Sequence, residues 1–67
     1  MRNLRFIECV RNDGERILIN IDNIETIFPL DEKQYTEKTR ICFSNGYVDV
    51  NDTYERIIQM IEYCEAN

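Results

Sequence analysis

The chain has 67 residues, a hydrophobic fraction of 43% and a net charge of −5, which is the composition of a small globular protein. Its length fits a single domain covering residues 1–67, and a chain this short buries only about 60% of the surface that its unfolded form exposes. The acidic balance argues against direct binding to nucleic acid, because nucleic-acid-binding proteins normally present a basic surface.

No stretch of the sequence approaches the roughly 18 apolar residues of a transmembrane helix, and the first residues lack the apolar segment and cleavage site of a secretory signal. We therefore expect a cytoplasmic protein without membrane insertion. Cys9, Cys42 and Cys64 are odd in number, and their spacing fits no CxxC metal or redox pattern. We expect three reduced thiols that pack as small hydrophobic side chains.

The first two predicted strands are Leu4–Val10 and Arg16–Ile21. Between them, Asp13-Gly14 suits a two-residue hairpin turn, because both central positions of a type I′ turn need positive φ. In the second strand, isoleucines alternate with other residues, as in a half-buried strand.

A two-residue turn at this position also fixes the pairing of the two strands. It places Val10 opposite Ile17 and Cys9 opposite Leu18. Side chains alternate between the two faces of a sheet, so one face becomes strongly apolar. The expected core-facing set is Phe6, Val10, Ile17, Ile19 and Ile21.

The middle of the chain is predicted as a turn, a third strand and an exposed connection. Asp22-Asn23 forms the turn, and Ile24–Phe28 forms the strand. Pro29 cannot donate a hydrogen bond to a neighbouring strand, so it marks a strand end or an edge. Asp31–Lys38 is polar and mixed in charge, which suits a solvent-exposed loop.

A second hairpin follows, with strands Thr39–Ser44 and Tyr47–Val50 around Asn45-Gly46, the strongest short hairpin signal in the sequence. One side of this hairpin is apolar and the other is mixed. The expected pairs are Phe43 with Val48, Ile41 with Val50, Cys42 with Asp49 and Ser44 with Tyr47.

Asp52 followed by Glu55 matches a capping box at the start of a helix that runs to about Cys64. Its apolar face at helical spacing consists of Tyr54, Ile57, Ile58, Ile61 and Cys64. The opposite face is marked by Glu55, Gln59 and Glu62. The predicted fold class is therefore α+β: an antiparallel β-meander of four to five strands with one C-terminal α-helix packed on one face.

The second face of the predicted sheet is not cleanly polar, since apolar, aromatic and arginine side chains mix there. These types are enriched in protein interfaces, and exposed apolar patches mark interaction sites. In a monomer, long arginine stems would instead cover the apolar groups. The candidate interaction face consists of Ile7, Cys9, Leu18, Arg40, Cys42 and Tyr47.

Little in the sequence supports catalysis or a bound cofactor. The chain has no histidine and a single serine, which excludes histidine-dependent triads and Cys–His nucleophiles. It also lacks a calcium loop and a phosphate-binding glycine motif. We expect a protein that is not an enzyme and that binds no metal or cofactor.

A different hypothesis uses the acidic side chains near the C-terminus. They would imitate the phosphates of nucleic acid and occupy a basic groove on another protein, as an acidic inhibitor of a nucleic-acid-binding or defence protein does. The residues of this alternative face are Asp49, Asp52, Glu55, Glu62 and Glu65.

The segments "ILINIDNIETIFP" (residues 17–29) and "ICFSNGYVDVNDTYERIIQMIEY" (residues 41–63) resemble the small FlbD-like proteins, which are encoded beside flagellar genes and also occur in prophages. The resemblance covers roughly two thirds of the chain and rests on structural motifs: the turn, the "NG" hairpin and the capped helix. It implies a shared fold and a non-enzymatic accessory role, linked to the flagellum or to a phage, and it implies no catalytic residue.

Taken together, these features predict a small non-enzymatic protein-interaction module. We expect it to bind a protein partner and to form a homo-oligomer through its sheet. The acidic phage-type inhibitor remains the alternative.

Overall fold

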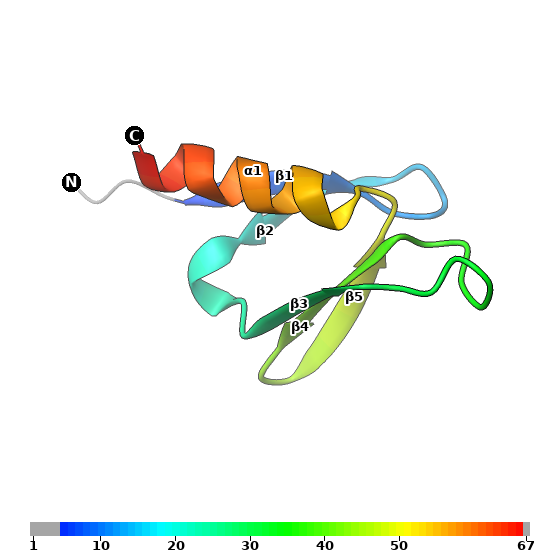
Figure 1. The fold of residues 1–67 in the computed structure, drawn as a ribbon. Coiled ribbons are helices and arrows are strands. Elements are labelled where there is room, and N and C mark those ends of the chain that lie inside the picture. Colours follow the sequence, from blue (N-terminus) through cyan, green and yellow to red (C-terminus); the bar gives the residue numbers. More distant parts are fainter. Residues whose placement is uncertain (1–4, 67) are drawn as a thin grey trace.

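The computed structural model describes residues 5–66. Its elements in chain order are β1 (Phe6–Val10), β2 (Arg16–Asn20), the short 3-10 helix η1 (Ile21–Asn23), β3 (Thr26–Pro29), β4 (Thr39–Phe43), β5 (Gly46–Val50) and α1 (Tyr54–Ala66) (Figure 1). The prediction of an α+β fold with antiparallel strands and one C-terminal helix is confirmed. Leu4, which the prediction included in the first strand, lies outside the described residues.

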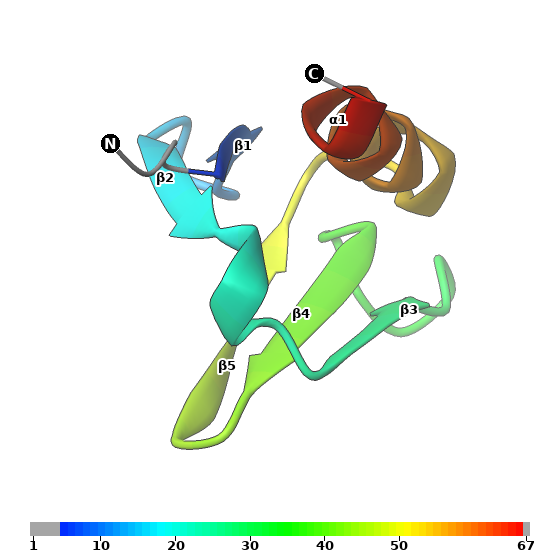
Figure 2. The ribbon, with the colours of Figure 1, turned by 90° about the vertical axis from the view of Figure 1, so that its left-hand side faces the viewer.

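The five strands divide between two antiparallel sheets, β1–β2 and β3–β4–β5. The two sheets meet at an isolated bridge between Arg11 and Val50. In Figure 2, the two-stranded sheet, the three-stranded sheet and α1 lie on three sides of a central region. This region holds one core cluster, whose buried members are Ile7, Cys9, Ile19, Ile21, Ile41, Val50 and Ile57.

The first hairpin has a three-residue loop, Asn12–Gly14, rather than the predicted two-residue turn. The N–H of Arg11 donates to the Glu15 carbonyl at 2.8 Å, and the N–H of Gly14 donates to the Arg11 carbonyl at 2.9 Å. Gly14 has a φ of 87°, as expected for a turn that ends in a left-handed residue. The Asp13 carboxylate accepts the N–H of Glu15 at 3.0 Å, so it completes the loop instead of occupying a type I′ turn.

This extra loop residue shifts the strand pairing by one position. Cys9 lies opposite Ile17 and Val10 lies opposite Arg16. A shift of one residue moves every side chain to the other face of a strand. The predicted core positions of Phe6 and Val10 are therefore wrong: Phe6 is 38% exposed, whereas Cys9 is fully buried.

In the second hairpin, the two-residue turn falls one position earlier than predicted, at Ser44-Asn45. Phe43 pairs with Gly46 and Ile41 pairs with Val48. Among the described residues only glycines have positive φ, so Asn45 does not adopt the conformation that a type I′ turn requires. The pairing differs from the prediction by two positions, which leaves each side chain on its predicted face.

The chain after β5 joins the two sheets and the helix through Asp52. The N–H of Val10 donates to the Asp52 carboxylate at 2.7 Å, and the N–H of Asn51 donates to the Val10 carbonyl at 2.7 Å. The hydroxyl of Thr39, which is fully buried, donates to the Asp52 carbonyl at 2.7 Å. One residue thus connects β1, β4 and the start of α1.

The predicted capping box at Asp52 and Glu55 is wrong. Thr53 caps the helix, because its hydroxyl accepts the N–H of Arg56 at 3.2 Å. The carboxylate of Asp52 instead accepts the N–H of Val10 and forms an ion pair with Arg56 at 3.5 Å. Threonine is a common N-cap residue. Because Thr53 caps the helix, the carboxylate of Asp52 is able to bond to Val10.

The predicted apolar face of α1 is confirmed for Ile57, Ile61 and Cys64, whereas Tyr54 and Ile58 do not belong to the core cluster and Met60, which was not predicted, packs against it. Ile57 is fully buried, and Ile61 and Cys64 pack against the core. The predicted polar residues Glu55, Gln59 and Glu62 are exposed. Within residues 5–66, no helix is long and apolar enough to span a membrane.

Replacing Asp52 tests the junction. Asp52→Ala removes the acceptor of the Val10 N–H, so we expect the free energy of unfolding to fall by about 1–3 kcal/mol. Asp52→Asn keeps an oxygen acceptor and should cost less. Urea unfolding measures both, with Glu55→Ala as an exposed control within about 0.5 kcal/mol of wild type. Equal losses in the two Asp52 variants would contradict this assignment.

Candidate functional site

The three-stranded sheet has one face against the core and one face that no other element covers in the described part of the chain. Alternation along the strands places Ile27, Ile41 and Val48 opposite one another on the inner face. We call the other side the outer face. Its residues are Thr26, Phe28, Arg40, Cys42, Tyr47 and Asp49.

Arg40 occupies the middle of the outer face and is fixed by Asp49. Its Nε and Nη2 atoms donate to the two carboxylate oxygens of Asp49 at 2.7 and 3.0 Å. The side chains are only 21% and 18% exposed, so this fork-like pair is shielded by its neighbours. Hydrogen bonding to Asp49 raises the pKa of the Arg40 guanidinium further above its ordinary value, which keeps the group charged.

Two tyrosine rings flank the guanidinium group. The Cζ atom of Arg40 lies 4.1 Å from the ring centre of Tyr47 and 5.4 Å from that of Tyr35. Both distances are within the range of a cation–π contact. The rings themselves remain accessible, with Tyr47 61% and Tyr35 37% exposed. We call Tyr35, Arg40, Tyr47 and Asp49 the Arg40 cluster.

Tyr35 reaches this cluster because the loop 31–38 is folded back on itself. The carbonyl of Asp31 accepts the N–H of Tyr35 at 3.0 Å, and the N–H of Leu30 donates to the Lys38 carbonyl at 2.8 Å. The Asp31 carboxylate also accepts the N–H of Lys33 at 3.0 Å. The predicted exposed connection is thus present, and its hydrogen bonds hold one aromatic ring beside the sheet.

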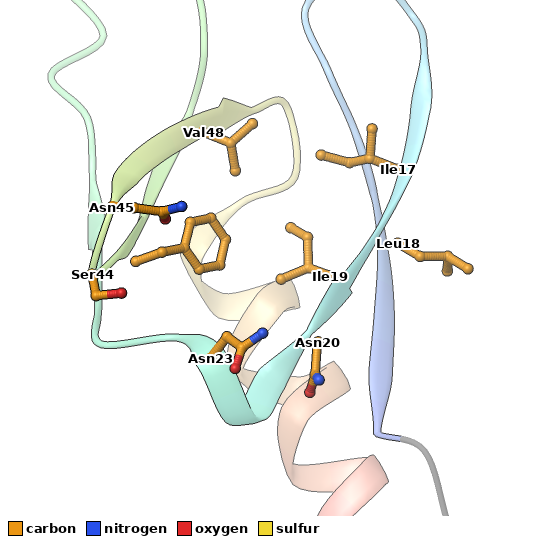
Figure 3. A pocket seen from close by; sticks show the side chains of 9 residues that line it. Ile17, Leu18, Ile19, Asn20, Asn23, Ser44, Asn45 and Val48 are labelled. Carbon is orange, nitrogen blue, oxygen red and sulfur yellow. The ribbon is translucent and has the colours of Figure 1, made fainter.

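A second feature is an open groove of about 550 Å³ between β2 and the tip of the β4–β5 hairpin. Figure 3 shows the side chains of Ile17, Ile19 and Val48 directed into it, while Leu18 points away. The groove is lined by Ile17, Leu18, Ile19, Asn20, Asn23, Phe43, Ser44, Asn45 and Val48. None of these side chains is ionisable near neutral pH, so the groove offers no general acid or base.

The structure separates the residues of the predicted interaction face. Ile7 is 3% exposed and Cys9 is fully buried, so their predicted place on an exposed face is wrong, because of the one-residue shift in the first hairpin. Leu18 is 68% exposed but belongs to the other sheet. The remaining predicted residues, Arg40, Cys42 and Tyr47, lie together on the outer face.

The acidic residues of the alternative hypothesis do not form one free surface. Asp49 is bonded to Arg40, and the side chain of Asp52 is only 9% exposed beside Arg56. Glu65 pairs with Arg5 at 3.3 Å. Glu55 and Glu62 are the exposed members of the set on α1.

The three cysteines are free thiols, and no group of acidic or cysteine side chains within residues 5–66 has an arrangement that could hold a metal ion. Burial raises the pKa of the Cys9 thiol to about 12, and the negative charge of Asp52 adds to this effect. A thiol of this kind stays protonated and is a poor nucleophile.

Sequence reasoning missed Phe28 and Tyr35 as members of this surface. Phe28 lies beside Arg40 across the β3–β4 pair and is 38% exposed. Because successive residues of a strand point to opposite faces, Phe28 could have been placed on the face opposite to that of Ile27. Both residues are apolar, however, so their polarity does not indicate which of them faces the core. No local pattern places Tyr35, because its position depends on how the loop 31–38 folds back.

No family model, no curated protein and no solved structure matches the chain. Its function therefore has to be argued from the site itself, since a fold alone does not specify one.

The raised pKa of Cys9 predicts a slow reaction with alkylating reagents. At pH 8, iodoacetamide should modify Cys9 at least about 100-fold more slowly in the folded chain than in urea, because the thiolate is rare and the sulfur is buried. Mass spectrometry of peptides after timed labelling measures this ratio, with the half-buried Cys42 and Cys64 as internal controls. Equal rates for the three folded cysteines would refute the burial of Cys9.

Proposed function

We propose that this chain is a small non-enzymatic protein-interaction module and that the outer face of the β3–β4–β5 sheet is its binding surface for a protein partner. The observation that carries the proposal is the Arg40 cluster. It places an immobilised arginine and two exposed tyrosine rings on a sheet face that no described element covers. Arginine and tyrosine dominate the energetic centres of protein interfaces.

The rigidity of the cluster favours binding. A side chain that is already fixed in the free protein loses little entropy when a partner arrives. Asp49 takes up Nε and Nη2 of Arg40, and a guanidinium group has five N–H donors in total. Three N–H donors therefore remain, two on Nη1 and one on Nη2, for a carbonyl or carboxylate of the partner, while the ring of Tyr47 would contribute apolar contact.

Several features favour binding over catalysis. The groove is lined by uncharged side chains, and Cys9 is buried with a raised pKa. The carboxylate of Asp49 bonds to Arg40 and that of Asp52 bonds to the N–H of Val10, so both carboxylates have a structural role. The resemblance to the FlbD-like proteins also supports an accessory role, and any link to a flagellum or a phage rests on that resemblance alone.

Site-specific cross-linking tests the proposal. A photoreactive phenylalanine analogue at Tyr47 should cross-link a protein partner in cells that express the chain at its native level. The same analogue at Tyr63, which lies on α1 and is 73% exposed, is the matched control. A partner captured from both positions at equal yield, or from neither, would contradict the outer face as the binding surface.

The purified partner then permits a quantitative test. Arg40→Glu puts a second carboxylate beside Asp49 and should weaken binding at least about tenfold, measured by titration calorimetry. Glu55→Lys combined with Glu62→Lys should leave the affinity unchanged. The reverse result, loss only in the double variant, would favour the acidic inhibitor in place of the proposed function.

A further inference from the structure

The two sheets have four edges, and the structure protects them unequally. A free edge exposes N–H and C=O groups that can pair with another chain, and natural proteins usually cover or interrupt such edges. On β1, the outward carbonyl of Val10 accepts the N–H of Asn51, and the outward N–H of Val10 donates to the Asp52 carboxylate. The Phe6 carbonyl on the same strand accepts a hydrogen bond from the Cys64 thiol at 3.4 Å.

The two edges of the three-stranded sheet are each limited in a different way. Leu30 bonds to Lys38, so alternation directs the backbone groups of Ile27 and Pro29 away from β4. Proline has no N–H, which blocks continuous pairing along β3. The edge of β5 is bridged to Arg11 only at its last residue, Val50, and alternation leaves two residues, Tyr47 and Asp49, with backbone groups directed away from β4.

The edge of β2 has no such protection in the described part of the chain. Backbone hydrogen bonds join Glu15 to Arg11 and Ile21 to Arg5, the two residues that flank β1. Hydrogen-bonded pairs alternate with non-bonded pairs along an antiparallel ladder. The backbone groups of Ile17 and Ile19 are therefore also directed toward their partners in β1. The N–H and C=O groups of three residues point outward from this strand: Arg16, Leu18 and Asn20.

We infer that β2 pairs antiparallel with β2 of a second copy of this chain, about a two-fold axis at Leu18. A two-fold axis that passes through a residue, rather than between two residues, brings outward groups together in both copies, and only the axis at Leu18 pairs all three outward residues. With the axis at Leu18, Leu18 lies opposite Leu18 of the second copy, and Arg16 lies opposite Asn20. Each such pair exchanges two hydrogen bonds, so the two β1–β2 sheets become one continuous four-stranded sheet.

The side chains suit this pairing. Leu18, which is 68% exposed, would pack against its symmetry-related copy, and cross-strand apolar pairs stabilise a sheet. Arg16 is already paired with Glu8 at 2.8 Å. The two Arg16 side chains would lie roughly 13 Å apart along the strands, beyond the screening length of about 8 Å at physiological salt.

The inner face supports the same geometry. Ile17 of one copy would lie opposite Ile19 of the other, and both side chains point into the groove in Figure 3. The second copy would therefore extend the apolar wall of the groove instead of blocking it. Strands of this length make a small interface, so we expect a dimer that dissociates at roughly micromolar concentrations.

The inference extends the proposed role in protein interaction, but it uses a different surface, so either can fail alone. Leu18→Pro tests it most directly, because this substitution removes an outward N–H and no hydrogen bond to β1. Pro29 shows that this chain already accepts proline at an outward position of an edge strand. Leu18→Ala is the matched control that keeps the N–H.

Sedimentation equilibrium between about 1 µM and about 1 mM should show a wild-type dimer. We expect Leu18→Pro to raise the dissociation constant at least about tenfold, since each copy loses a hydrogen bond at the axis, and Leu18→Ala to raise it less. Circular dichroism verifies that each variant is folded. A wild-type monomer at every concentration, or a dimer that Leu18→Pro leaves unchanged, would overturn the inference.

Hydrogen exchange of the wild-type chain gives an answer even where Leu18→Pro does not fold. The amides of Arg16, Leu18 and Asn20 should become protected as the concentration rises, while those of Ile17 and Ile19 stay protected throughout. Arg40→Glu should not change this pattern. Loss of the dimer in Arg40→Glu would assign self-association to the outer face and overturn the pairing of β2, without contradicting the proposed binding role of Arg40.

Discussion

The junction at Asp52 holds the molecule together. Two small sheets and one helix cannot each bury an apolar face alone, and they share one core only where the chain forces them into contact. The carboxylate of Asp52 accepts the N–H of Val10, and its carbonyl accepts the hydroxyl of Thr39. Groups that are far apart in sequence meet at this point, so the angle between the sheets, the open groove and the uncovered outer face all depend on it.

The sequence predicted the kinds of elements better than their pairing. Alternating isoleucines and the helical spacing of Ile57 and Ile61 are local signals, and both identify their elements correctly. The loop before Glu15 is different, because two-residue and three-residue loops can both use Asp13 and Gly14. The choice between them depends on which face of β1 fits the core, and that is a long-range property of the fold.

The same contrast explains what was predictable at the candidate site. The second hairpin differs from its prediction by two positions, so Arg40, Cys42 and Tyr47 still share a face. Tyr35 could not be placed, because its approach to Arg40 depends on backbone hydrogen bonds within an irregular loop. The assignment of Asp52 to the helix cap failed for a related reason: a nearer threonine satisfied the cap, and a distant N–H in β1 needed the carboxylate.

The first hairpin loop also limits how this chain can change its length during evolution. Exposed loops generally tolerate insertions and deletions, and Asn12–Gly14 is exposed. However, gaining or losing a single residue there would exchange the buried Ile7 and Cys9 for their charged or half-exposed neighbours. Homologous sequences should therefore accept substitutions in this loop readily, and length differences mainly in steps of two residues.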